Sequence, residues 1–229
     1  RAMHEEAPGR GAAVNVEGFI NTVEQARAAG CETVVYASTS SIYGDRTEPS
    51  PESLPVRART GYEASKLSRE RYGEYYSEFH DISMAGMRLF SVYQGFAGAE
   101  EHKGEYANLI AQFADQLDRG VPPEIWGDGT QTRDFTHVDD IVGGLELAAD
   151  HERDGIYSLG TGESCSLSEL VARLNETLDT DVDPKYAPLE MQNYVHDTMA
   201  DPSKMEAATG WTPSIALEEG LERVCSPYT

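Results

Sequence analysis

Stretches with helical periodicity alternate with strand-like stretches along this chain, and that alternation limits the folds open to it. Apolar residues recur at helical spacing over 13–26 until Gly30, and Thr33–Ala37 is then typical of a short buried strand. A second helical pattern covers 61–79, and 82–90 is again strand-like. Helices that alternate with strands in this way form parallel sheets with helices on both faces. The sequence therefore predicts an α/β protein with a doubly wound parallel sheet.

Beyond residue 90 the expected elements are shorter and the turns between them contain more glycine. Helices are expected at about 106–117, 138–149 and 167–178, after Pro202 and after Ile215. Strands are expected at 124–126 and 156–159, with an extended segment near Tyr186.

Composition excludes two classes of partner. Forty acidic and eighteen basic residues give a formal charge of −22. This balance repels nucleic acid and anionic membranes, and no basic cluster interrupts it. Acidic residues spread along a whole chain are typical of halophilic proteins, because high salt screens their mutual repulsion. We therefore expect no nucleic-acid or membrane partner, and adaptation to salt.

The cysteines and apolar runs indicate the compartment. Cys31, Cys165 and Cys225 are odd in number and lack Cys-x-x-Cys spacing, which favours reduced thiols over a disulfide framework or a metal site. No apolar run approaches the roughly 18 residues of a membrane span, and no leader pattern is visible at Arg1. The sequence predicts a soluble, cytoplasmic protein.

Tyr62 and Lys66 are the first candidates for catalysis. Their spacing of four residues puts them on one face of the predicted helix, with Cβ atoms about 5–6 Å apart. A tyrosine that accepts a proton near neutral pH needs its pKa lowered by roughly three units, and a fixed cation favours the phenolate. The spacing thus suits a catalytic base. The alternative is a tyrosine that packs inward beside a lysine that reaches solvent.

A hydroxyl-rich turn, Ser38-Thr-Ser-Ser-Ile-Tyr-Gly44, follows the first predicted strand. Ligands bind at the carboxyl ends of strands in open α/β sheets, so this turn is a second candidate. An ordinary serine-rich turn is the alternative.

Several motifs occur in order along the chain: Asn15-Val-Glu-Gly18, Ser38-Thr-Ser-Ser-Ile-Tyr-Gly44, Tyr62-Glu-Ala-Ser-Lys66, Arg88-Leu-Phe-Ser-Val-Tyr93, Gly127-Asp-Gly-Thr-Gln-Thr-Arg-Asp-Phe135, Gly160-Thr-Gly162 and Ala200-Asp-Pro-Ser-Lys204. The ordered set resembles the extended short-chain dehydrogenase/reductase family, in particular its nucleotide-sugar epimerases and dehydratases. The resemblance extends over almost the whole chain.

The resemblance implies a Rossmann-type NAD-binding domain and a smaller α/β nucleotide-sugar-binding domain. Residues 1–90 would be the C-terminal part of the first, and 91–229 would form mainly the second, with some later segments returning to the first. The family's Gly-rich phosphate loop would lie ahead of Arg1, so the chain is expected to be N-terminally truncated and to bind NAD poorly by itself.

The resemblance also implies roles for individual residues. Tyr62 would be the catalytic base, Lys66 would bind the nicotinamide ribose and lower the pKa of Tyr62, and Thr39 would hydrogen-bond the sugar hydroxyl that is oxidised. The residues expected to contact NAD, besides Tyr62 and Lys66, are Asn15, Ser38 and Leu89.

Arg133 would pair with the substrate phosphate, for which a planar guanidinium is suited. The alternative is a surface arginine bonded to Asp134 or Asp139. Trp126 would lie against the nucleobase, although a core tryptophan stays open. The further residues expected to contact the substrate are Thr39, Ser91 and Asn108.

The reaction class depends on the residues that follow Thr39. Dehydratases of the family carry an Asp-Glu pair there, and the decarboxylases tend to keep the glutamate, whereas this chain has Ser40 and Ser41. Serine hydroxyls are poor proton donors and acceptors near pH 7. This favours NAD-dependent 4-epimerisation of a nucleotide sugar such as a UDP-hexose, through a 4-keto intermediate. A dehydratase or reductase and a non-catalytic binding or scaffold relative remain open.

Two substitutions leave the sugar undetermined. Ser91 stands where the family usually has an asparagine, and Met191 lies near the place of a second phosphate-binding arginine. The family often dimerises through the helix pair that corresponds to 12–29 and 61–79, so a homodimer is expected.

Overall fold

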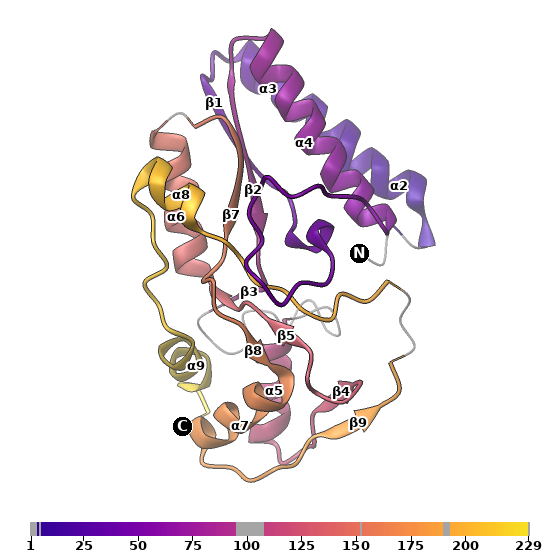
Figure 1. The fold of residues 1–229 in the computed structure, drawn as a ribbon, viewed down its shortest axis with the longest axis vertical. Helices are drawn as coiled ribbons and strands as arrows, with labels where there is room; N and C mark the ends of the chain where they lie inside the picture. Colours follow the sequence, from indigo (N-terminus) through magenta and orange to yellow (C-terminus); the bar gives the residue numbers. More distant parts are fainter. Residues whose placement is uncertain (1–3, 5, 95–107, 152, 190–192, 229) are drawn as a thin grey trace.

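The computed structural model describes residues 4, 6–94, 108–151, 153–189 and 193–228 (Figure 1). Its elements in chain order are α2 (Pro8–Ala12), the π-helical turn η1 (Ala13–Glu17), α3 (Gly18–Ala28), β1 (Thr33–Ala37), the 3-10 turn η2 (Ser40–Tyr43), α4 (Gly61–Phe79), β2 (Ser83–Leu89), β3 (Val92–Tyr93), α5 (Leu109–Asp118), β4 (Glu124–Trp126), β5 (Thr132–Arg133), β6 (Thr136–His137), α6 (Val138–Asp150), β7 (Gly155–Leu159), β8 (Cys165–Ser166), α7 (Leu167–Leu178), β9 (Lys185–Ala187), α8 (Ser203–Thr209) and α9 (Leu217–Cys225).

A parallel sheet with strand order β1-β2-β7 organises one half of the molecule. Its register pairs Thr33 with Ser83 and Ala85 with Gly155. Figure 1 shows α3 and α4 on one side of this sheet and α6 and α8 on the other. The predicted α/β fold with a parallel sheet covered on both faces is confirmed, and the late strand β7 returns to the early sheet.

Successive residues of β2 face opposite helix layers, as the two-residue period of a strand requires. Met84 packs with Phe19 of α3, whereas Met87 packs with Ile141 of α6. The same alternation directs Arg88 toward α4, where it meets Glu70. One polar side chain of the sheet therefore lies in the layer that carries the candidate catalytic residues.

The first turn of α4 is held by two side-chain contacts that resemble a capping box, although Glu63 bonds to the residue before the N-cap. The Thr60 hydroxyl accepts a hydrogen bond from the Glu63 backbone N–H (3.2 Å), and the Glu63 carboxylate accepts one from the Arg59 N–H (2.6 Å). These contacts satisfy amides that have no partner within the helix. The turn that carries Tyr62 is thereby fixed where the chain enters the helix.

Two predicted helices differ from the observed ones. The helix expected over 12–29 is divided into α2, η1 and α3, a local change that apolar periodicity does not reveal. The helix expected from 106 begins at Leu109, because the Asn108 side chain accepts the Ala111 N–H (2.9 Å) and ends the extended segment there. Residues 106 and 107 lie outside the described residues.

The other half of the molecule is built from α5, α7 and α9, which gather below the sheet in Figure 1. Their core includes Phe113, Leu170 and Val224. The strands β3, β5, β6 and β8 have two residues each, too few for a readable period, so they were not predicted. None of the helices in the described ranges is both long and apolar enough to cross a membrane.

Candidate active site

Tyr62 and Lys66 lie in the first two turns of α4, beside the end of β1. Lys66 Nζ is 5.6 Å from the centroid of the Tyr62 ring and donates a hydrogen bond to the Ala37 carbonyl (3.1 Å). Lys66 is only 8% exposed, and burial together with the charge of Arg69 lowers the pKa of its ammonium to about 8. The lysine does not reach solvent, so that alternative is wrong and a cation lies beside the phenol.

Thr39 follows β1 directly and caps η2. Its Oγ1 accepts the Ser41 backbone N–H (3.3 Å) and lies 3.0 Å from the Ser41 hydroxyl. Thr39 is buried, and Lys66 bonds to Ala37 only two residues earlier in the chain. Lys66, which lies beside Tyr62, is therefore bonded two residues before Thr39 at the carboxyl end of β1.

Asn15 lies in η1 and is joined to α4 by several bonds. Its amide nitrogen donates to Ser65 Oγ (3.0 Å) and lies 2.8 Å from His4 Nε2, while its Oδ1 accepts from Arg69 (2.8 Å). Ser65 Oγ in turn donates to the Tyr62 carbonyl (2.7 Å). The His4 ring also meets the Tyr62 ring edge-on, with centroids 5.7 Å apart. Asn15 thus lies in one hydrogen-bonded group with the turn that carries Tyr62.

Arg69 was not predicted as a site residue, although it holds Asn15 against α4. Arg69 donates to both the side chain and the backbone carbonyl of Asn15 (2.8 and 2.6 Å). It lies seven residues after Tyr62, so the helical spacing that relates Tyr62 to Lys66 could have indicated it. The contact of His4 with Asn15 could not be predicted from spacing, because it depends on how the chain folds between the two residues.

Ser38 is buried between α4 and the sheet. Its hydroxyl donates to the Glu70 carboxylate (2.5 Å), which also accepts two hydrogen bonds from Arg88 (3.0 and 2.8 Å). The Ser38 side chain is therefore committed to a protein partner, and a contact from this residue to a cofactor would use its backbone. Glu70 and Arg88 were not predicted as part of the site.

Leu89 and Ser91 lie where β2 ends. Leu89 is half-buried and packs against the apolar cluster on the α6 side of the sheet. Ser91 has a φ of +21°, and its carbonyl accepts the Thr136 N–H (3.4 Å). Asparagine adopts positive φ more readily than serine. The turn therefore suits the asparagine that is usual at this position in the family that the sequence resembles.

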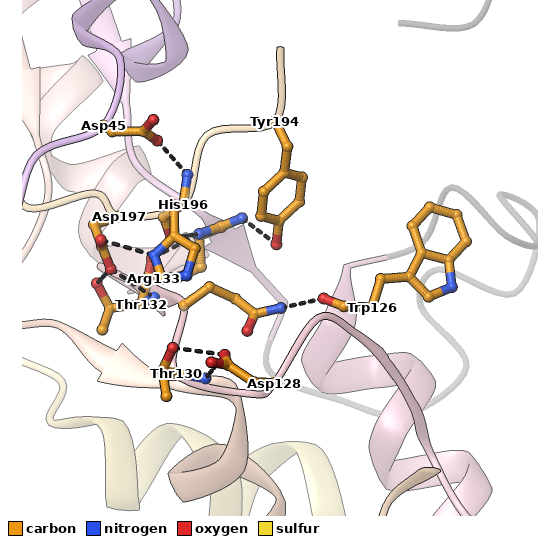
Figure 2. A network of polar contacts seen from close by, with 10 residues as sticks. Asp45, Trp126, Asp128, Thr130, Thr132, Arg133, Tyr194, His196 and Asp197 are labelled. Carbon is orange, nitrogen blue, oxygen red and sulfur yellow. Dashed lines mark hydrogen bonds and ion pairs between the residues drawn. The ribbon is translucent and has the colours of Figure 1, made fainter. Parts of the chain in front are cut away.

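Trp126 ends β4 on the surface of the molecule. The residue is 46% exposed, and its indole N–H donates to Glu124 (2.8 Å). The Gln131 side chain donates to the Trp126 backbone carbonyl (2.6 Å). Figure 2 shows the indole pointing away from the neighbouring polar network. The alternative of a core tryptophan is wrong.

Arg133 lies in β5 and is held by a later segment of the chain (Figure 2). Its guanidinium donates to the His196 carbonyl (2.7 Å), the Thr132 carbonyl (2.7 Å) and the Tyr194 hydroxyl (2.8 Å). The Tyr194 ring also covers it, with 5.1 Å between the guanidinium carbon and the ring centroid. Tyr194 and His196 were not predicted, because their contact with Arg133 joins segments far apart in the sequence.

The acidic residues near Arg133 have other partners. The Asp134 carboxylate accepts the backbone N–H groups of Thr161, Gly162 and Ala200 (2.8 to 2.9 Å). Asp139 pairs with Arg223 (3.1 Å). The alternative in which Arg133 is bonded to Asp134 or Asp139 is therefore wrong.

The two halves of the molecule meet beside Arg133. Asp45, just after η2, accepts the His196 backbone N–H, and the Arg46 N–H donates to the Asp197 carbonyl (3.0 Å). The Asp197 carboxylate accepts from Thr132 (2.8 Å), the residue before Arg133. Among the described residues, no group of three or more His, Cys, Asp or Glu side chains is arranged to hold a metal ion.

The sequence and the fold of this chain are similar to those of known nucleotide-sugar enzymes. The crystal structure of UDP-glucose 4-epimerase with UDP-glucose from Thermotoga maritima matches with a TM-score of 0.91 at 28% identity, over 98% of this chain and 72% of that one. The UDP-glucose 4-epimerase of Mycolicibacterium smegmatis is 30% identical over 215 residues, which cover 93% of this chain and 67% of that protein.

A UDP-glucuronate 4-epimerase of Thermodesulfobacterium geofontis is 32% identical over 211 residues, which cover 91% of this chain and 63% of that protein. The chain thus spans about two thirds of the length of the curated relatives that it matches. Residues 2–160 match the NAD dependent epimerase/dehydratase family as a whole. With more than half of its length matched in this way, the chain belongs to the NAD dependent epimerase/dehydratase family.

Proposed function

We propose that the protein containing this chain is an NAD-dependent 4-epimerase of a nucleotide sugar, with a UDP-hexose as substrate. One observation carries the proposal: a buried lysine lies beside Tyr62 and bonds to the end of the strand that leads to Thr39. Family membership supports it, as do the UDP-sugar 4-epimerases among the relatives.

The residues around Lys66 fit the nicotinamide ribose of NAD. An ammonium group has three donors, and one of those of Lys66 reaches the Ala37 carbonyl. None of the ion pairs among the described residues joins Lys66 to a carboxylate, so its remaining donors suit the hydroxyls of a ribose. Asn15, Ser38 and Leu89 surround the same end of the sheet and complete the proposed contacts.

In the proposed mechanism Tyr62 acts as the base that takes the proton from the sugar C4 hydroxyl. Thr39 hydrogen-bonds the same oxygen and orients it. Lys66 stabilises the Tyr62 phenolate through its charge. When bound beside Lys66, NAD would supply the hydride chemistry at C4, as acceptor in the oxidation and as donor in the return step. The 4-keto sugar turns in the site between these steps, so that hydride would return to the opposite face of C4 while Tyr62 gives the proton back to the C4 oxygen.

The residues beside Thr39 favour epimerisation over elimination of water. The Ser41 hydroxyl lies 3.0 Å from Thr39 Oγ1, where the dehydratases of the family carry a carboxylate. The nearby acid Glu63 is paired with Arg59 (3.3 Å), which also donates to the Ser41 carbonyl. An acid–base pair for dehydration is therefore not offered by these residues, and the dehydratase reading has less support.

Arg133 and Trp126 are the proposed anchors of the nucleotide. The guanidinium carries a charge that no carboxylate neutralises in its described contacts, so it suits the diphosphate. The exposed indole of Trp126 suits a nucleobase. Ser91, just after the end of β2, and Asn108, at the start of α5, are the further proposed contacts to the substrate.

Substitution of Tyr62 by phenylalanine tests the reaction. In the protein that contains this chain, Tyr62→Phe is expected to lower kcat for the interconversion of UDP-glucose and UDP-galactose by at least about 100-fold, because it removes the base. The KM is expected to change little. Tyr72→Phe on the exposed side of α4 is the control. Substantial turnover by Tyr62→Phe would reject the assignment, and a wild-type protein without turnover would favour a binding or scaffold role.

A homodimer is the proposed assembly. Tyr72, Tyr75 and Phe79 form an exposed apolar stripe on α4, with 38%, 45% and 65% of their surfaces exposed. Val14 in the adjacent η1 is 55% exposed. The double substitution Tyr75→Glu and Phe79→Glu is expected to convert the dimer to a monomer in light scattering, whereas Tyr186→Glu on β9 is not. A wild-type protein that is monomeric at micromolar concentration would contradict the proposal.

A further inference from the structure

Glu70 lies in α4 beneath the candidate active site and is only 2% exposed. Its carboxylate accepts three hydrogen bonds, one from Ser38 (2.5 Å) and two from Arg88 (3.0 and 2.8 Å). Ser38 follows β1 and Arg88 belongs to β2. One buried carboxylate thus joins a helix to the ends of two neighbouring strands.

Each of these three segments carries a residue of the proposed reaction. Glu70 lies four residues after Lys66 and eight after Tyr62, so the three share one face of α4. Ser38 immediately precedes Thr39 in the chain. We infer that Glu70 is a positioning residue, which fixes the end of β1 against α4 and so sets where Thr39 stands relative to Tyr62. This inference rests on the proposed function.

The backbone after Ser38 explains how the hydrogen bond between Ser38 and Glu70 acts on Thr39. Thr39 is extended, with φ −151° and ψ 141°, and its Oγ1 caps η2. Side chains of consecutive extended residues leave the chain in opposite directions. Holding the Ser38 hydroxyl on Glu70 therefore sets the direction in which the Thr39 hydroxyl leaves the strand.

Contacts of Arg88 extend this group of hydrogen-bonded residues to the third strand, β7. The Tyr43 ring covers the Arg88 guanidinium at 4.8 Å, and the Tyr43 hydroxyl lies 2.9 Å from Ser158 Oγ in β7. Burial disfavours the Arg88 cation, but the bonds to Glu70 outweigh burial and raise its pKa. The Arg88 guanidinium therefore stays charged, and the group spans β1, β2 and β7.

The Glu70–Arg88 ion pair is better explained by the orientation that it imposes than by a gain in stability. A buried ion pair gains little net free energy over a well-packed apolar pair, because both ions lose their hydration. The bidentate contact of a guanidinium with a carboxylate is directional, however, and holds both side chains in one orientation. A directional contact placed next to Thr39 and two turns from Tyr62 is the property that positioning requires.

The substitution Ser38→Ala tests the inference in the protein that contains this chain. It removes the bond to Glu70 and leaves the Glu70–Arg88 pair in place. We expect kcat for the UDP-hexose to fall about tenfold while KM stays within about twofold and the melting temperature within about 2 °C. Ser68→Ala, which removes an exposed hydroxyl from the same helix, is the matched control and is expected to behave as the wild type. Glu70→Gln is expected to lower kcat further at similar KM.

Hydrogen exchange of the segment 38–44 provides a readout that does not depend on turnover. Ser38→Ala is expected to speed exchange in this segment and to leave the rest of the chain unchanged. Unchanged exchange there, or faster exchange with an unchanged kcat, overturns the inference. If the wild-type protein epimerises no UDP-hexose, the proposed function fails, and the exchange measurement still decides whether Glu70 anchors this segment.

Discussion

At the scale of single residues, Lys66 combines burial with a charge that has no carboxylate partner in its described contacts. Burial disfavours an ammonium and the nearby Arg69 adds repulsion, so the pKa of Lys66 falls to about 8. Such a cation lowers the stability of the folded chain. It is also the group that stabilises the phenolate of Tyr62 in the proposed mechanism, so stability and function conflict at this position.

Lys66→Met is therefore expected to stabilise the protein at pH 7, by about 2 kcal/mol, while it abolishes turnover. The folded-state pKa of about 8 lies below the unfolded value of 10.5, so the wild type carries the full penalty below pH 8. The penalty disappears as pH rises from 8 to 10.5, because the unfolded chain binds the extra proton there.

Urea unfolding at pH 7 and pH 10 would measure this difference. The advantage of Lys66→Met over the wild type should shrink at the higher pH, whereas Lys185→Met on the exposed strand β9 should give the same small effect at both. A Lys66→Met advantage that is absent at pH 7, or that does not change with pH, would contradict the expected penalty.

Only part of the site could be predicted residue by residue. Tyr62 and Lys66 share a helical spacing, so their proximity follows from local geometry alone. Glu70 lies on the same face but was not predicted, because its role depends on Arg88 from another element. Trp126 could be placed either in the core or on the surface, and exposure of its ring was decided by the fold.

At the scale of elements, α4 packs closely on the sheet where two glycines face one tyrosine. A Cβ at Gly73 would lie 2.3 Å from the Tyr36 hydroxyl oxygen and 2.9 Å from the ring carbon that bears it. A Cβ at Gly86 would lie 2.7 Å from the same hydroxyl. The buried ring therefore occupies a slot between α4 and β2 that has no room for another methyl group.

Gly73→Ala is expected to destabilise the protein by about 2 kcal/mol, although alanine favours helices more than glycine does. The cause is overpacking against Tyr36. Gly143→Ala in α6, where a Cβ would meet no atom within 4 Å, is the control and is expected to be neutral or to stabilise by up to about 1 kcal/mol.

Chemical unfolding of both variants would measure the difference. Adding Tyr36→Phe to Gly73→Ala should recover part of the loss, because it removes the closest atom. Equal stability of the Gly73→Ala and Gly143→Ala variants would show that the slot between α4 and β2 relaxes without cost.

Long elements were predicted more successfully than short ones. The helix over 61–79 and the strand over 33–37 were predicted with their observed bounds, because each has a clear apolar pattern and flanking turn residues. The division of the first helix at η1 and the two-residue strands β3, β5, β6 and β8 carry no periodic signal. Both features depend on contacts with segments elsewhere in the chain.

At the scale of the whole molecule, the formal charge of −22 is the dominant property. Mutual repulsion of this size destabilises a compact chain and is screened by salt. Few basic residues are available to neutralise it, and many of the exposed arginines already pair with neighbouring acids, such as Arg71 with Glu74 (2.7 Å) and Arg119 with Asp115 (2.5 Å).

The melting temperature is therefore expected to rise by several degrees between about 0.05 M and about 0.5 M KCl at pH 7, the range over which screening increases most. Calorimetry would measure it. The same increase in salt should have a smaller effect at pH 4.5, where part of the carboxylates are protonated. A melting temperature that falls as salt is added at pH 7 would contradict adaptation to salt.

Local patterns in the chain were enough to predict the order of helices and strands, the parallel sheet and the proximity of Tyr62 to Lys66. These features follow from side-chain periods of two residues in strands and about 3.6 residues in helices, which depend only on residues close together in the sequence. The contacts of Glu70 with Ser38 and Arg88, and the contact of Tyr194 with Arg133, became visible only in the folded chain. Those contacts join residues far apart in the sequence, and the spacing along one chain carries no information about which distant partner a side chain meets.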